Sequence, residues 1–171
     1  NPVKRLSRIY GRMQKAMAAV DRIFYVLDLQ ESITDKPDAK ILPPVKGHVS
    51  VKNVSFSYDG IHAALENVSI EVKPGQMIAF VGPSGAGKST IANLIPRFYD
   101  VNDGAIKIDG FDIRDVKLNS LREQIGIVPQ ETTLFSTTVM ENIRYGRLDA
   151  TDDEVIAASI AANCDEFIKQ L

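Results

Sequence analysis

The feature that most constrains the fold of this chain is a glycine-rich run in its middle. The run consists of Gly82, Pro83, Ser84, Gly85, Ala86, Gly87, Lys88 and Ser89. It matches G-x-x-x-x-G-K-[ST], the pattern of a loop that wraps phosphate groups. Such a loop needs a strand before it and a helix after it. The apolar residues 77–81 predict the strand and residues 90–95 predict the helix. The sequence therefore predicts an α/β fold.

The residue types in this run suit a bound nucleoside triphosphate. Its glycines can adopt positive φ, which turns backbone N–H groups toward an anion. Lys88 supplies a mobile cation for the β- and γ-phosphates, and Ser89 offers a hydroxyl to Mg²⁺. The helix that begins next adds the positive end of its dipole. The alternative is a glycine-rich turn without a ligand, which the flanking strand and helix argue against.

Composition places the chain among ordinary globular proteins. Its 171 residues are enough for one domain, with 44% hydrophobic and 25% charged residues. The net charge of −2 gives no sign of nucleic-acid binding. Cys164 is the only cysteine, so no internal disulfide can form, which fits a reducing compartment. No apolar run approaches the length of about 18 residues that a membrane span needs.

The N-terminal third divides into a helix and a linker. Apolar residues at spacings of three and four predict one helix over residues 3–29, within a segment that we assign to residues 1–30, with basic residues concentrated in its first turns. This helix is either an ordinary amphipathic one or the continuation of an upstream transmembrane helix. The chain has no signal-peptide pattern and begins without Met, so we expect it to come from the middle of a longer polypeptide. Prolines and polar residues predict a linker over 31–47.

Alternating apolar residues predict a strand over 48–58, with a slip near Lys52 and Asn53, and another over 68–72. Residues 105–108 lead into Asp109-Gly110, a hairpin signal.

Later segments predict one more strand and two helices. Residues 125–128 form a short apolar run that predicts a strand. Capping-box patterns at 120–123 and 151–154 predict two helix starts.

The order of short motifs resembles the nucleotide-binding domain of ATP-binding cassette (ABC) transporters of the exporter type. The motifs are, in chain order, Phe56-Ser57-Tyr58, the glycine-rich loop, Arg97-Phe98-Tyr99-Asp100, Asp109-Gly110, Leu121-Arg122, Val128-Pro129-Gln130, Leu134-Phe135-Ser136 and Glu141-Asn142-Ile143. The resemblance covers nearly all of residues 20–171. It implies a P-loop NTPase (RecA-like) core with an antiparallel β subdomain over 48–130, and the start of an α-helical subdomain over 131–171. The domain is then incomplete.

The resemblance also implies roles for particular residues. Tyr58 matches the A-loop aromatic that stacks on adenine, which a ring face can do for any base. Gln130 matches the Q-loop glutamine, whose amide oxygen is a suitable ligand for Mg²⁺. Lys88 and Gln130 are the expected catalytic residues, and Ser89 and Gln130 the expected metal ligands. The expected cofactors are ATP and Mg²⁺. The nucleotide-binding set is Tyr58, Gly82, Pro83, Ser84, Gly85, Ala86, Gly87, Lys88, Ser89, Thr90 and Gln130.

Other motifs of the family are absent from these residues. The sequence Leu-Ser-Gly-Gly-Gln does not occur, and no Walker B strand with its aspartate and catalytic glutamate follows. Asp165-Glu166 lies in a predicted helical stretch, so it is not a Walker B pair. His48 and His62 both precede the glycine-rich loop, so neither matches the switch histidine. We therefore expect the full-length protein to be an ATPase and these 171 residues alone to be inactive.

The leading hypothesis is the motor of an exporter, coupling ATP hydrolysis to export of a lipid, drug or peptide. Its expected partners are a transmembrane domain and a second nucleotide-binding domain, in a homodimer or heterodimer, without nucleic acid. Its expected location is the cytoplasmic face of the cell membrane. The alternatives are a soluble ABC-type ATPase and a regulatory nucleotide-binding module without turnover.

Overall fold

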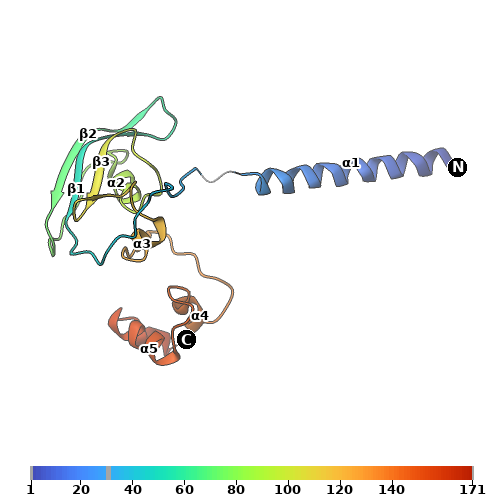
Figure 1. Cartoon of the computed structure of the whole chain (residues 1–171). Helices are drawn as coiled ribbons and strands as arrows, with labels where there is room; N and C mark the ends of the chain where they lie inside the picture. The colour runs from blue at the N-terminus through green and yellow to red at the C-terminus, as the bar shows by residue number, and fades with distance from the viewer. Residues whose placement is uncertain (1, 30–31, 171) are drawn as a thin grey trace. The chain divides into compact units, whose positions relative to one another are not determined.

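The computed structural model describes residues 2–29 and 32–170 (Figure 1). The chain divides into two compact units, Asn1–Gly126 and Ile127–Leu171, and each is described by itself. The first unit holds the sheet and the glycine-rich loop, and the second consists of short helices. The predicted domain boundaries at 30, 47 and 130 stay predictions.

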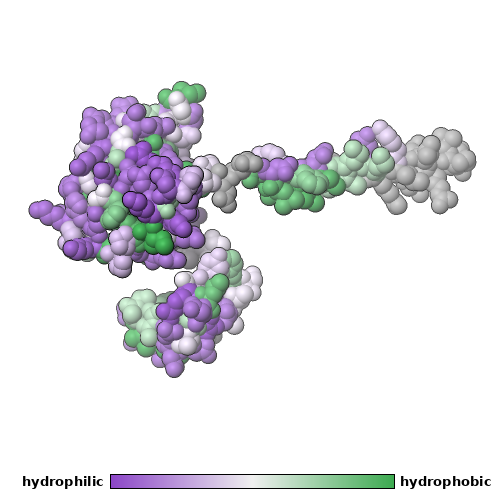
Figure 2. All heavy atoms as spheres, in the orientation of Figure 1, coloured by the Kyte–Doolittle hydropathy of each residue, from purple (hydrophilic) through white to green (hydrophobic). Residues whose placement is uncertain are grey.

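Helix α1, Pro2–Leu27, has the length that the apolar spacing predicted. Along its described part, hydrophobic side chains gather on one side, as Figure 2 shows. Met13, Met17 and Phe24 of this helix are all more than half exposed. None of the helices in residues 2–29 and 32–170 combines the length and apolar character required to cross a bilayer. Continuity of α1 with a transmembrane helix stays a prediction.

The linker is ordered by long-range hydrogen bonds rather than by regular structure. From residue 32 to residue 47 its only ladder contact is an isolated parallel bridge between Lys40 and Val116. The N–H of Leu42 donates to Ser120 Oγ at 2.9 Å, and the N–H of Val45 donates to Gln124 Oε1 at 2.8 Å. These bonds fix the linker in the first unit.

An antiparallel sheet forms the centre of the first unit. Its strands are β1 (Val49–Ser57), β2 (Ala63–Val72), β3 (Asp103–Ile108) and β4 (Phe111–Asp112), in the order β2-β1-β3-β4.

The pairing of β1 is interrupted where a slip was expected. The register shifts between Val51 and Val54, and Asn53 adopts a φ of 49°. The predicted irregularity near Lys52 and Asn53 is therefore confirmed as a bulge.

The turn between β3 and β4 confirms the predicted hairpin. Asp109 and Gly110 have φ values of 48° and 87°, as a two-residue hairpin turn of the favoured twist requires. The Asp109 carboxylate also accepts the backbone N–H groups of His48 and Lys46. These bonds, that of His48 foremost, hold the pKa of Asp109 below its usual value.

The hydrophobic core joins the sheet to two short helices, α2 (Lys88–Leu94) and α3 (Leu118–Arg122). The cluster consists of Leu42, Val51, Val54, Phe56, Leu65, Ile91, Leu94, Ile106, Ile108, Ile113, Val116 and Leu121. Ile91 and Leu94 come from α2, so the helix that follows the glycine-rich loop is anchored on the sheet (Figure 1). Burial of each such side chain contributes about 1.5–3 kcal/mol.

Two predicted strands do not form. Residues 77–81 and 125–128 have no regular secondary structure and pair with no strand in the described part of the chain. Met77 and Val81 are 95% and 90% exposed. An apolar run becomes a strand only when a neighbour satisfies its backbone groups, and apolar composition alone does not provide that neighbour.

Helix α3 begins earlier than its sequence pattern predicted. Its N-cap is Lys117, so Ser120 lies inside the helix. The N–H of Leu118 is capped instead by Asp35 Oδ1 at 2.8 Å, from the linker. Ser120 Oγ donates to the Lys117 carbonyl at 2.8 Å while it accepts from Leu42. The start of α3 is therefore capped by a residue distant in sequence and not by the capping box predicted at residues 120–123.

The second unit contains α4 (Val139–Arg144), α5 (Asp152–Ala161) and α6 (Asp165–Ile168). The predicted capping box at the start of α5 is confirmed, because Thr151 N donates to Glu154 Oε2 at 2.9 Å and Glu154 N donates to Thr151 Oγ1 at 3.4 Å. Asp165 and Glu166 lie in the first turn of α6, in agreement with the helix expected there.

Candidate functional site

The glycine-rich loop and Tyr58 line one pocket of about 560 Å³ in the first unit. Strand β1 leads to Tyr58, β2 contributes Ala64, and the loop and the first turn of α2 contribute residues 84–90. The structure thus brings together most of the predicted nucleotide-binding residues. Gly82 and Pro83 do not line the pocket, but their carbonyls bind the lysine that does.

The backbone of the loop needs its glycines. Gly85 and Gly87 have φ values of 82° and 79°, which side chains rarely adopt. A Cβ on Gly87 would also lie 2.5 Å from Leu65 Cδ2 and 2.8 Å from the Ala64 carbonyl oxygen. Gly87 therefore allows both the left-handed turn and the close approach of the loop to β2.

Lys88 is folded back over the loop. Its Nζ donates to the carbonyls of Gly82 at 2.9 Å and Pro83 at 2.6 Å. An ammonium group has three donors, so the two bonds leave one for an anion. The same bonds hold the positive charge against the loop.

The first turn of α2 shapes the rest of the pocket wall. Gly87 is the N-cap and provides no side-chain cap, while its carbonyl accepts the N–H of Ile91 at 3.1 Å. Ser89 is exposed, whereas Thr90 is buried and its Oγ1 accepts a hydrogen bond from Tyr58 Oη at 3.3 Å. Thr90 therefore ties the aromatic residue to the phosphate loop.

Tyr58 is 53% exposed, yet its ring is fixed by two edge-to-face contacts. Its centroid lies 4.8 Å from that of Phe56, at 84°, and 5.1 Å from that of Tyr99, at 89°. Sequence reasoning assigned no site role to Tyr99. The sequence pointed to Tyr99 only through its place in the motif Arg97-Phe98-Tyr99-Asp100. Its contact with Tyr58 joins residues 41 positions apart, and no local pattern predicts such a contact.

Gln130 belongs to the second unit and lies exposed in the segment before α4. Its part in the site stays a prediction. In the same unit, Asn142 holds the segment around Phe135. Its Oδ1 accepts the Phe135 N–H at 2.8 Å, and its Nδ2 donates to the Phe135 carbonyl at 3.1 Å.

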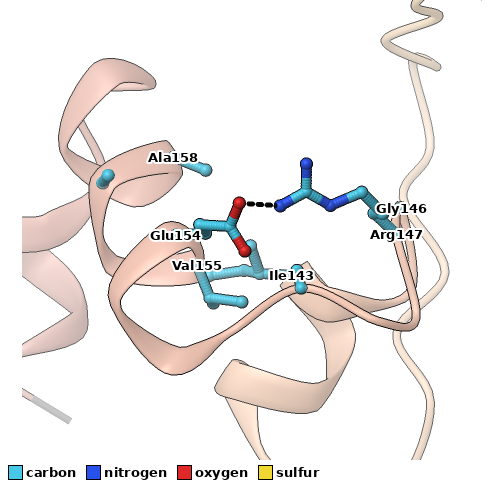
Figure 3. Close-up of a pocket in the computed structure, with 8 residues that line it drawn as sticks. Ile143, Gly146, Arg147, Glu154, Val155 and Ala158 are labelled. Atoms are coloured by element: carbon cyan, nitrogen blue, oxygen red, sulfur yellow. Dashed lines mark ion pairs between the residues drawn. The ribbon is translucent and has the colours of Figure 1, made fainter.

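A pocket of about 450 Å³ in the second unit has a different character (Figure 3). It is lined mainly by apolar residues such as Ile143, Val155 and Ala158, and an ion pair joins Arg147 to Glu154. The bond from the Thr151 N–H and then that from Arg147 lower the pKa of Glu154 to about 2. Arg147 lines this pocket, and its charge is paired with that of Glu154 rather than left free for a phosphate.

The glycine turns, the lysine and the uncapped first helical turn define a phosphate-binding loop of the P-loop nucleotidase class. The chain belongs to the ABC transporter family, whose profile matches residues 65–171.

Similar proteins extend the comparison over the whole chain. It is 47% identical over 170 residues to the ATP-dependent lipid A-core flippase of Syntrophus aciditrophicus, covering 99% of this chain and 28% of that protein. It is 45% identical over 171 residues to the mitochondrial iron-sulfur clusters transporter atm1 of Aspergillus fumigatus, covering 99% of this chain and 24% of that protein.

Among solved structures, a bacterial Atm1-family ABC exporter with ATP bound matches with a TM-score of 0.81 and 42% identity, over 99% of this chain and 30% of that one. The resemblance to ABC exporters and the predicted fold class are therefore confirmed. The chain spans less than a third of the length of these relatives.

Proposed function

We propose that this chain is the ATP-binding part of the motor domain of an ABC exporter, in which ATP binding and hydrolysis drive export across a membrane. The observation that carries the proposal is the single pocket that unites Tyr58 with Lys88 and the loop glycines. The names of the relatives, a lipid A-core flippase and an exporter with ATP bound, support the same function.

The residues that line the pocket suit the two ends of a nucleoside triphosphate. Loop N–H groups and Lys88 would hold the β- and γ-phosphates, and the Tyr58 ring would stack on the base. A side chain at Gly87 would displace the loop from β2 and distort this cradle.

Ser89 and Gln130 are the proposed protein ligands of Mg²⁺. Among the described residues, no three His, Cys, Asp or Glu side chains converge as a metal site. The exposed Ser89 hydroxyl suits Mg²⁺, which usually keeps several waters and binds through substrate phosphates. When bound, the ion would neutralise charge that develops on the transferred phosphoryl group.

The proposal includes the partners that the exporter relatives support. The motor would act with a transmembrane domain and pair with a second nucleotide-binding domain, at the cytoplasmic face of the membrane. The exported substrate would be a lipid, drug or peptide, and it would be selected by the transmembrane domain.

Substitutions of Tyr58 test this function at the base end of the pocket. Tyr58→Ala should weaken ATP affinity of the full-length protein by about 5- to 150-fold, the range that loss of one base–aromatic stack gives. Tyr58→Trp should retain most of the affinity, because stacking needs only a π-face. Equilibrium titration with a fluorescent ATP analogue measures both.

Tyr25→Ala, at an exposed tyrosine of α1 that does not line the pocket, is the matched control for this series. It should bind ATP like the wild type. Equal ATP affinity in the wild type and in Tyr58→Ala would contradict the proposed place of the base.

A further inference from the structure

The turn after α2 is held in a conformation that few residues adopt. Arg97 has a φ of 55° and is 3% exposed. The left-handed conformation is unfavourable for any residue with a side chain, so it persists only where the surroundings enforce it. One nitrogen of its guanidinium, Nη1, is buried and finds no acceptor within residues 2–29 and 32–170. Both features oppose stability, which is typical of a segment retained for its geometry.

Hydrogen bonds that the Arg97 guanidinium donates, and others that the turn's carbonyls accept, hold this turn. Arg97 Nε donates to Asp100 Oδ1 at 2.7 Å, and Nη2 donates to Asp100 Oδ2 at 3.1 Å, a bidentate pair of fixed geometry. Nη2 also reaches the Thr34 carbonyl at 3.3 Å. From α3, Arg122 donates to the carbonyls of Pro96 at 3.1 Å and Arg97 at 2.8 Å. The turn is therefore fixed through both its side chain and its backbone.

The residue inside this turn that contacts the site is Tyr99. Its ring lies edge-to-face against Tyr58 and 5.6 Å from the ring of Phe56. Just beyond the turn, the N–H of Asn102 donates to the Ser55 carbonyl at 3.1 Å, and Asn102 Oδ1 accepts the N–H of Ser57 at 2.8 Å. The segment is thereby tied to β1 one residue before Tyr58.

We propose that Tyr99 is a positioning residue for the nucleotide base. The turn locked by Arg97 and Asp100 holds its ring against Tyr58 and sets the orientation at which Tyr58 stacks. The inference rests on the function proposed for the pocket. It predicts that Tyr99 affects recognition of the base more than recognition of the phosphates, because Tyr99 contacts Tyr58 and is not among the residues that line the pocket beside the glycine-rich loop.

The test compares two ligands in the full-length protein: ATP, and inorganic tripolyphosphate, which carries no base. Both affinities are measured by competition with a fluorescent ATP analogue. Tyr99→Leu removes the ring and should weaken ATP binding about three- to tenfold, the range of an aromatic pair contact. Its affinity for tripolyphosphate should stay within about twofold of wild type. Tyr99→Phe keeps the ring and should bind both ligands like the wild type.

A double-mutant cycle identifies the route of the effect. If Tyr99 acts through Tyr58, Tyr99→Leu should have no further effect on ATP affinity in a Tyr58→Ala background. Additive losses would overturn the positioning role, as would equal losses for both ligands or unchanged ATP affinity in Tyr99→Leu. A wild-type protein that binds neither ligand would instead overturn the proposed function of the pocket.

Discussion

Replacing Lys88 with alanine is expected to lower the ATPase rate of the full-length protein by about a hundredfold or more. Its ammonium group is the cation held directly against the loop, by the Gly82 and Pro83 carbonyls. Preorganised charge at a developing anion is worth about 2.7–4 kcal/mol in comparable substitutions. The steady-state release of phosphate by the purified protein, with ATP and Mg²⁺ at saturation, measures the loss.

A second lysine variant serves as the control, because it shows whether the loss of activity is specific to Lys88. Lys73 is exposed, directly follows β2 and does not line the pocket. Lys73→Ala should retain the wild-type rate. An undiminished rate in Lys88→Ala would show that the phosphates bind elsewhere.

Residues 1–171, produced as an isolated polypeptide, are expected to show no ATPase activity and no cooperative unfolding transition. Met77, Val81 and Val128 are 90–96% exposed, in segments that pair with no described strand. A large apolar side chain contributes about 1.5–3 kcal/mol when buried. Leaving several in water removes a large part of a net stability of about 5–15 kcal/mol. Exposed apolar segments of this kind also promote aggregation.

The loss of activity has a separate reason, since these residues include neither the signature sequence nor the Walker B carboxylates. Hydrolysis needs a group that orients the attacking water. Thermal unfolding followed by circular dichroism, together with a phosphate-release assay, tests both parts, and the full-length protein is the positive control. A sharp transition accompanied by ATP turnover would refute both.

Local patterns predicted the parts of the fold that local interactions determine. The bulge near Asn53, the hairpin at Asp109-Gly110 and the capping box at Thr151 each depend on residues a few positions apart. The motif of the glycine-rich loop likewise predicted a pocket that includes Lys88, because the loop and the first turn of its helix are contiguous.

Parts that depend on distant partners were not predicted. The start of α3 is set by Asp35, 83 residues away, so the capping pattern at Ser120 was misleading. Residues 77–81 have the composition of a buried strand but lack a hydrogen-bonded neighbour among the described residues. Tyr99 was not assigned to the site because its contact with Tyr58 appears only once α2 is packed on the sheet.

Photolabelling with an ATP analogue that carries an azide on its adenine ring tests the central claim most directly. In the full-length protein with Mg²⁺, followed by trypsin digestion and mass spectrometry, the label should be found on the peptide 53–88, which contains Tyr58 and ends at Lys88, because trypsin does not cleave the Lys73–Pro74 bond. Excess ATP should abolish the labelling. A label that ATP does not displace, or one found only on peptides from outside the pocket, would contradict the assignment of this chain as the nucleotide-binding part of an exporter.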